Sequence, residues 1–317
     1  MVIDTILRVR YNPQVRFRSL VTAVFFAAFL ALGFAFGQGP GGYNPGAAQG
    51  LDLAGNWAPV FHEDATERGP GPELVNYLGI PITEGARLGG LSYDASRFTV
   101  PEHQCEVHGV SYIYRGPLNL RIWELRDPVS EQLIAIMNYI DNYEQTRTIW
   151  MDGRPHPSEH APHTWMGFST GKWEGNILTV YTTHLKRNWI RRNGLRQSDA
   201  ATLTEHFIRH GDHLTHVTIV TDPDTLSEPF IRSQDFIPRT LNGEAWKYPC
   251  DAVVEVPRPR GAVPNYLPGK NPFVHEFADK FHIPVEAALG GPETMYPEYR
   301  LKLKQVPAAP AAPAAQK

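Results

Sequence analysis

The sequence predicts a mainly β protein, an antiparallel barrel or strongly curved sheet of eight to nine strands. Three observations favour this class. From residue 118 onward, short apolar and β-branched runs alternate with turn signals. Most connections between these runs are short, which favours antiparallel hairpins over helical crossovers. The run 131–140 is apolar on both alternating faces, so one face packs a core and the other must be covered.

The N-terminal segment is typical of an export signal. Arginines precede an apolar run over 20–37 that ends in small residues, which predicts a signal peptide over 1–37 and a flexible linker over 38–50. An uncleaved anchor is the alternative, because the run is about as long as a membrane-spanning helix. In both cases we expect a periplasmic or secreted protein that meets the membrane only through this segment.

A β-barrel-like domain is predicted over 51–256, and its first part, up to residue 110, has irregular apolar spacing that indicates an N-terminal wrap. Short helices are expected near 72–78 and 84–91. The predicted strands are 118–125, 131–140, 145–151, 164–170, 176–184, 202–210, 213–220, 228–237 and 246–254.

The hairpin over 202–220 turns at Gly211-Asp212, which pairs His210 with His213 and Glu205 with Thr218. Neither face of this hairpin is purely apolar, so the inward face stays open. One face carries Leu203, Glu205, Phe207, Leu214, His216 and Val220, and the other carries His206, Ile208, His210, His213, Val217 and Ile219.

A C-terminal helical appendage is predicted over 257–305, followed by a disordered Ala/Pro tail over 306–317. Asn271-Pro272 is a good helix start, and Pro284 ends that helix. A second short helix stops at glycine. We expect this part to pack against the barrel domain without adding a catalytic domain.

Charge and cysteine content narrow the function classes. The 317 residues carry 30 Lys and Arg against 33 Asp and Glu, a net charge of −3 without a basic stripe, which argues against a nucleic-acid partner. Cys105 and Cys250 are the only cysteines, and an exported chain most simply joins them in a disulfide bond. Two free buried thiols are the alternative.

Three histidines, His156, His160 and His163, are the weak candidates for a metal site. Prolines between them break any helix that would place them on one face. We therefore predict no metal or cofactor, with zinc as the alternative. Asp152 and Arg154 form either part of a ligand site or a turn braced by its own charges.

The candidate catalytic residues are His156, Arg154 and Glu205. If Glu205 lines a cavity among apolar neighbours, its pKa would be raised and it could exchange protons with His216. The seven tryptophans either line a ligand site or fill a β core. The candidate ligand-binding residues are Asp152, His160, His163, Trp165, Trp173 and His216.

Three segments, 152–157 (DGRPHP), 165–180 (WMGFSTGKWEGNILTV) and 206–223, resemble a large family of uncharacterised exported bacterial proteins. The resemblance implies kinship and export, but it does not indicate a function. Phe168 stands where relatives often carry histidine, and Asn176 where aspartate is usual. Gly55-Asn56-Trp57 is also similar to the G-x-W of lipocalin-like barrels. The positions that match the family pattern are Asp152, Gly153, Arg154, His156, Pro157, Trp165, Gly167, Ser169, Gly171, Trp173, Glu174, Gly175, Asp222 and Pro223.

The favoured hypothesis is an exported barrel that binds a small apolar or aromatic molecule, because closed barrels of this size have room for one ligand. Two alternatives stay open. One is a periplasmic hydrolase, lyase or isomerase that uses His156 with Arg154 and Glu205. The other is a structural or envelope-interaction protein.

Overall fold

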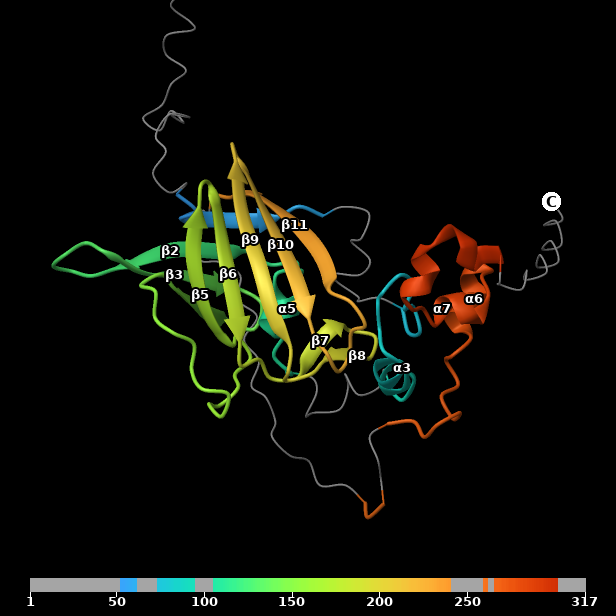
Figure 1. The fold of residues 1–317 in the computed structure, drawn as a ribbon. Helices are drawn as coiled ribbons and strands as arrows, with labels where there is room; N and C mark the ends of the chain where they lie inside the picture. The colour runs from blue at the N-terminus through green and yellow to red at the C-terminus, as the bar shows by residue number, and fades with distance from the viewer. Residues whose placement is uncertain (1–51, 62–72, 95–104, 241–258, 262–264, 302–317) are drawn as a thin grey trace, which may run out of the picture. The chain divides into compact units, whose positions relative to one another are not determined.

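The computed structural model describes residues 52–61, 73–94, 105–240, 259–261 and 265–301. A closed barrel of nine strands is its main feature, in the order β1-β11-β10-β9-β6-β5-β4-β3-β2 (Figure 1). The predicted fold class is confirmed. The barrel strands are β1 (Gly55–Pro59), β2 (Leu120–Arg126), β3 (Leu133–Ile140), β4 (Gln145–Trp150), β5 (Phe168–Glu174), β6 (Ile177–Thr183), β9 (Thr202–His210), β10 (His213–Thr221) and β11 (Phe230–Pro238).

Neighbouring barrel strands are antiparallel except β4 and β5, which run parallel and pair at Ile149 with Ser169 and at Trp150 with Thr170. The long segment 151–167 connects them, because a tight hairpin cannot join parallel strands. The strand predicted over 164–170 therefore began four residues too soon, since β5 spans Phe168–Glu174.

The barrel is closed by β1, which pairs with both β2 and β11. The sequence analysis assigned residues 55–59 to an irregular N-terminal wrap. That assignment was wrong, because these residues form a barrel strand. Trp57 explains why so short a strand holds its place: its side chain is 2% exposed, and its Nε1 donates to the Leu53 carbonyl at 2.9 Å. The strand predicted at 246–254 lies outside the described residues.

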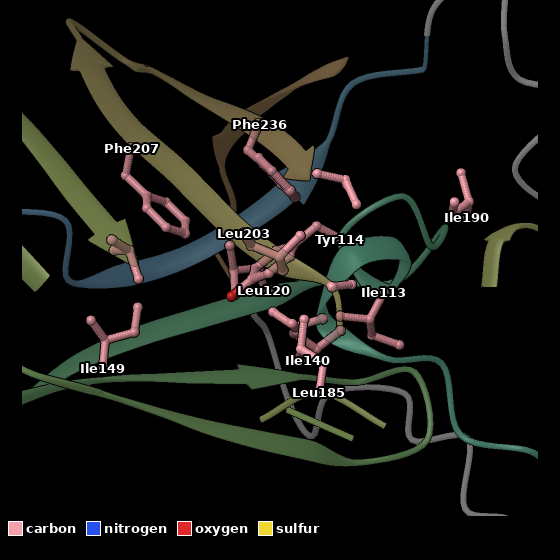
Figure 2. Close-up of a cluster of buried hydrophobic side chains, with 14 of the residues drawn as sticks. Ile113, Tyr114, Leu120, Ile140, Ile149, Leu185, Ile190, Leu203, Phe207 and Phe236 are labelled. Carbon is pink, nitrogen blue, oxygen red and sulfur yellow. The ribbon is translucent and has the colours of Figure 1, made fainter. Parts of the chain in front are cut away.

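The β9–β10 hairpin has the predicted register, with His210 opposite His213 and Glu205 opposite Thr218. The face that carries Glu205 is the inward one, because Leu203, Glu205 and Phe207 are all buried. Figure 2 shows Ile113, Leu120, Leu203, Ile140 and Leu185 gathered together, with Phe207, Phe236 and Ile149 further along the barrel. Strand alternation thus settles what composition left open.

Two of the described helices lie between β1 and β2 in the sequence. The α3 helix (Glu84–Leu91) has the predicted bounds and begins where the Thr83 hydroxyl accepts from the Ala86 amide. The α5 helix (Val110–Ile113) is buried along its whole length.

Two features differ from the sequence-based expectation. Residues 73–78 form turns and not the expected helix. The strands β7 (Asn188–Arg191) and β8 (Leu195–Gln197) form a small separate sheet that was not predicted.

The C-terminal part contains α6 (Glu276–Phe281), α7 (Val285–Ala288) and the 3-10 helices η2 (Pro292–Met295) and η3 (Pro297–Leu301). It is tied to the segment between β1 and β2, because the Tyr77 amide donates to the Ala288 carbonyl at 2.9 Å and Arg87 donates to the Gly290 carbonyl at 2.7 Å.

Two predictions concern residues that are not described. Within the described ranges, no helix is long and apolar enough to cross a membrane. The apolar run at 20–37 lies outside them. Cys105 is described but Cys250 is not, so the disulfide bond stays a prediction.

Candidate functional site: a polar layer inside the barrel

An arginine lies in the barrel interior. Arg147 alternates with Ile149 along β4, so both side chains point inward, and Arg147 is only 1% exposed. Its Nε donates to the Ser169 hydroxyl at 3.1 Å, and its Nη2 donates to the Thr182 hydroxyl at 2.8 Å. Hydroxyls from β5 and β6 therefore fix the guanidinium plane.

Glu205 faces Arg147 from β9. The guanidinium Nη1 lies 3.0 Å from Oε1 of Glu205, and Nη2 pairs with Oε2, so the pair is bidentate. His216 on β10 places its Nε2 2.9 Å from Oε1. Because a carboxylate accepts hydrogen bonds, this nitrogen carries the proton. Both Glu205 and His216 are buried.

Tyr114, directly after α5, reaches into the same layer. Its hydroxyl accepts from Arg147 Nη1 at 3.0 Å and from Asn138 Nδ2 at 2.8 Å. Its ring centroid lies 4.3 Å from that of His216, and Phe207 stacks on His216 at 4.4 Å. The imidazole thus contacts two aromatic rings, whose centroids lie 5.9 Å from each other.

Electrostatics in this layer differ from the sequence-based expectation for Glu205. Burial alone would raise the pKa of its carboxyl, but the Arg147 charge and the His216 hydrogen bond hold that pKa well below its usual range. Burial lowers the pKa of His216, which outweighs the opposing effect of Glu205. Near neutral pH the layer therefore holds one ion pair and a neutral imidazole. The expected raised pKa of Glu205 was wrong, because Arg147 was not considered.

The polar layer lies midway along the barrel, between two apolar layers. Leu203 precedes Glu205 on β9 and Phe207 follows it, and all three point inward. Leu203 packs near Ile113 of α5, whereas Phe207 lies further along the barrel (Figure 2). Rings and aliphatic side chains thus exclude water from the ion pair on both sides.

At the end of the barrel away from α5, two inward side chains are only half-buried, although Leu178, Leu214 and Phe236 at the same end are fully buried. Met151 follows Ile149 on the inward face, and Trp173 follows Gly171; both pack against the core while keeping contact with solvent. A Cβ at Gly171 would lie 2.7 Å from the Met151 sulfur and 2.9 Å from Ile149. The absence of a side chain at Gly171 lets Met151 lie against the sheet.

In this layer the donors of the guanidinium all form hydrogen bonds, whereas one amide oxygen has no partner among the described residues. Each N–H of the Arg147 guanidinium has an acceptor among Ser169, Thr182, Tyr114 and Glu205. Asn138 is 1% exposed, and its Oδ1 has no hydrogen-bond partner among the described residues. It is therefore an acceptor that the described residues do not satisfy.

The proposed catalytic residues are not brought together. His156 lies on the outer face of the barrel, with Nδ1 2.7 Å from the Thr183 hydroxyl and Nε2 2.9 Å from the Thr170 hydroxyl. Glu205 points inward from β9, so the sheet separates it from His156. The sequence treated the two as one set, but strand alternation places them on opposite faces.

Arg154 is also outside. Its Nε lies 2.9 Å from Asp152 Oδ1, and its guanidinium stacks 3.4 Å from the centre of the Trp150 ring. The interpretation as a turn braced by its own charges therefore describes the geometry.

The other candidate residues of the 151–167 segment are spread over the surface. His160 is exposed beside Glu159, and His163 donates from Nδ1 to the Leu185 carbonyl at 2.8 Å. Trp165 lies beneath the Lys186 ammonium. In the described part of the chain, no group of three or more His, Cys, Asp or Glu side chains is arranged to hold a metal ion.

The sequence interpretation missed Arg147, Tyr114 and Asn138. A signal for Arg147 was available, because TRTIW alternates and puts Arg147 in phase with Ile149 on an otherwise apolar face. Tyr114 and Asn138 carry no such signal, since their roles depend on where α5 and β3 lie in space.

Comparison of the chain with protein-family models, with curated proteins and with solved structures finds no match in any of the three.

Proposed function

We propose that the protein is an exported, barrel-type binding protein for a small molecule with an apolar or aromatic body. The observation that carries the proposal is the polar layer of Arg147, Glu205 and His216 inside an otherwise apolar barrel. Burying an ion pair costs several kcal/mol per charge, and apolar replacements are often as stable. A requirement for ligand recognition accounts for retaining such a layer where stability alone does not.

The barrel end at Met151 and Trp173 is the entrance in this proposal. Both side chains point inward and are half-buried, which suits contact with an apolar ligand. Beyond them lie Phe207 and then the polar layer, where Asn138 Oδ1 offers an acceptor to a donor group of the ligand. Trp173 was among the ligand-binding residues expected from the sequence, and it keeps that role here.

A titration with the neutral fluorescent probe N-phenyl-1-naphthylamine tests the proposal. We expect saturable binding that Trp173→Ala weakens by roughly tenfold, since losing one aromatic contact costs about 1–2 kcal/mol. Trp123→Ala is the matched control, because Trp123 lies on the outer face of β2. Equal loss in both variants, or no saturable binding, would argue against a ligand inside the barrel.

A further inference from the structure

Three of the histidine–threonine pairs on the outer face of the barrel are candidates for a base and its nucleophile. They join His156 to Thr170 at 2.9 Å, His206 to Thr179 at 3.1 Å and His210 to Thr215 at 2.9 Å. An imidazole activates a hydroxyl only when the hydroxyl donates the proton. The direction of each hydrogen bond therefore decides whether the pair has catalytic potential.

In two of the pairs the hydroxyl proton is committed elsewhere. Thr179 donates to the Glu174 carboxylate at 2.8 Å, and Thr215 donates to the Asp235 carboxylate at 2.6 Å. Since a hydroxyl has one proton and an ionised carboxylate only accepts, the imidazoles of these pairs must donate to the threonine oxygens. Neither pair can act as base and nucleophile.

The third pair belongs to a chain of hydrogen bonds whose direction is fixed at one end. His184 places Nε2 2.8 Å from the Ser158 carbonyl, so this nitrogen carries the proton. In the neutral ring, Nδ1 of His184 then accepts from the Thr183 hydroxyl at 2.7 Å. Because the Thr183 hydroxyl donates its only proton in the hydrogen bond to His184, its oxygen accepts from His156 Nδ1, at 2.7 Å.

The same reasoning reaches Thr170. With its proton on Nδ1, neutral His156 has a bare Nε2, which accepts from the Thr170 hydroxyl. Burial lowers the pKa of His156, which favours this neutral form. Phe168 and Tyr181 lie beside the imidazole, with ring centroids at 5.1 and 5.2 Å.

We propose that Thr170 is a nucleophile that His156 activates for acyl transfer from a small carboxylic ester with an aromatic or apolar alcohol group. Thr183 and His184 are positioning residues, because they fix the tautomer of His156. Phe168 and Tyr181 supply the apolar surface for the ester. This site is on the opposite face of the sheet from the polar layer and does not depend on the proposed binding function.

The reaction balances with water as the second substrate. The Thr170 oxygen forms a bond to the ester carbonyl carbon, its proton passes to His156 Nε2, and the carbon–oxygen bond to the alcohol breaks as the alcohol takes that proton. A water molecule then attacks the acyl-threonine while His156 accepts its proton. This step releases the carboxylic acid and restores the Thr170 hydroxyl.

The test is a short incubation of the whole protein with 4-nitrophenyl acetate, followed by peptide mapping. We expect an acetyl group on Thr170 and a first-turnover release of nitrophenolate that His156→Gln slows by roughly 100-fold. Thr170→Val should abolish the Thr170 adduct, and Thr170→Ser should retain it. Thr179→Val is the matched control and should leave the rate unchanged.

Nitrogen NMR of the histidine side chains tests the positioning residues. Wild-type His156 is expected to carry its proton on Nδ1, and His184→Phe should shift that proton toward Nε2 and slow acylation. An adduct confined to His156 or to lysines, with Thr170 unmodified, would overturn the proposal. So would a wild-type His156 with its proton on Nε2, a readout that needs no variant to fold.

Discussion

Thr182 and Thr183 are adjacent on β6, and their hydroxyls belong to two separate networks on opposite faces of the sheet. Thr182 Oγ1 accepts from Arg147 inside the barrel at 2.8 Å, while Thr183 Oγ1 contacts His156 on the outer face at 2.7 Å. Ser169 and Thr170 on β5 repeat the arrangement, the first toward Arg147 and the second toward His156. The alternation of strand side chains thus gives one hairpin two polar clusters.

The Arg147–Glu205 pair predicts a strong penalty for removing one partner. Glu205→Leu leaves a buried guanidinium without its carboxylate, and we expect it to lower the free energy of unfolding by about 3–5 kcal/mol. Urea denaturation of the purified protein measures this loss.

The double variant Arg147→Met with Glu205→Leu is the matched control. It removes both charges, so we expect it to regain most of the stability that the single variant loses. Losses that simply add in the double variant would show that the two residues do not stabilise each other.

His108 predicts a pH dependence of stability. It is buried, its Nδ1 has no hydrogen-bond partner among the described residues, and its pKa is lowered to about 3 by burial and by the Arg192 charge. Unfolded histidine titrates near 6.5. Between these values the unfolded chain binds more protons, so stability is complete above pH 6.5 and falls as pH decreases toward 3.

The variant His108→Phe isolates this contribution. Phenylalanine keeps the edge contacts with Tyr112 and Tyr143 and removes the titrating group. In urea denaturation between about pH 5.5 and 4, where the unfolded histidine is almost fully protonated and the folded one is not, the wild type should lose about 1.4 kcal/mol per pH unit more than the variant. Parallel pH profiles would mean that His108 is protonated in the folded state.

Local patterns predicted much of the fold. Periodicity and turn signals located most barrel strands, and Gly211-Asp212 fixed the β9–β10 register to the residue. They failed at β1, where Gly55 and Pro59 weaken the strand pattern. That strand forms because β2 and β11 supply partners on both sides, and those contacts are far apart in the sequence.

The candidate site was predicted less well. Glu205 and His216 were correctly placed on one face of the hairpin, but the sequence did not decide whether that face points into the barrel. A carboxylate among apolar residues is unfavourable there unless it has a partner. That partner is Arg147 on β4, which reaches Glu205 only when the barrel closes. His156 was predicted as a catalytic residue that acts with Arg154 and Glu205, and the structure does not bring these three together. Its actual partners are Thr170 and Thr183, and these contacts depend on the parallel pairing of β4 and β5.

Two glycines with similar backbone angles predict different costs of substitution. Gly167 has φ 65° and Gly175 has φ 62°, so alanine is strained at both by about 1 kcal/mol. A Cβ at Gly167 would lie 2.6 Å from the Thr183 carbonyl oxygen, whereas one at Gly175 meets nothing within 4 Å. Gly167→Ala should therefore cost about 2 kcal/mol more than Gly175→Ala in urea denaturation. Equal losses of stability in the two variants would mean that Gly167 lies further from the Thr183 carbonyl on β6 than the structure shows.

Native mass spectrometry of the purified protein tests the binding proposal most directly. The account predicts a small organic molecule that stays bound in the wild type and in Trp123→Ala and is lost in Trp173→Ala. Exposure of the empty protein to an extract of small apolar molecules should restore the bound mass. A wild-type protein that neither carries nor takes up any such molecule would contradict the claim that the barrel holds a ligand.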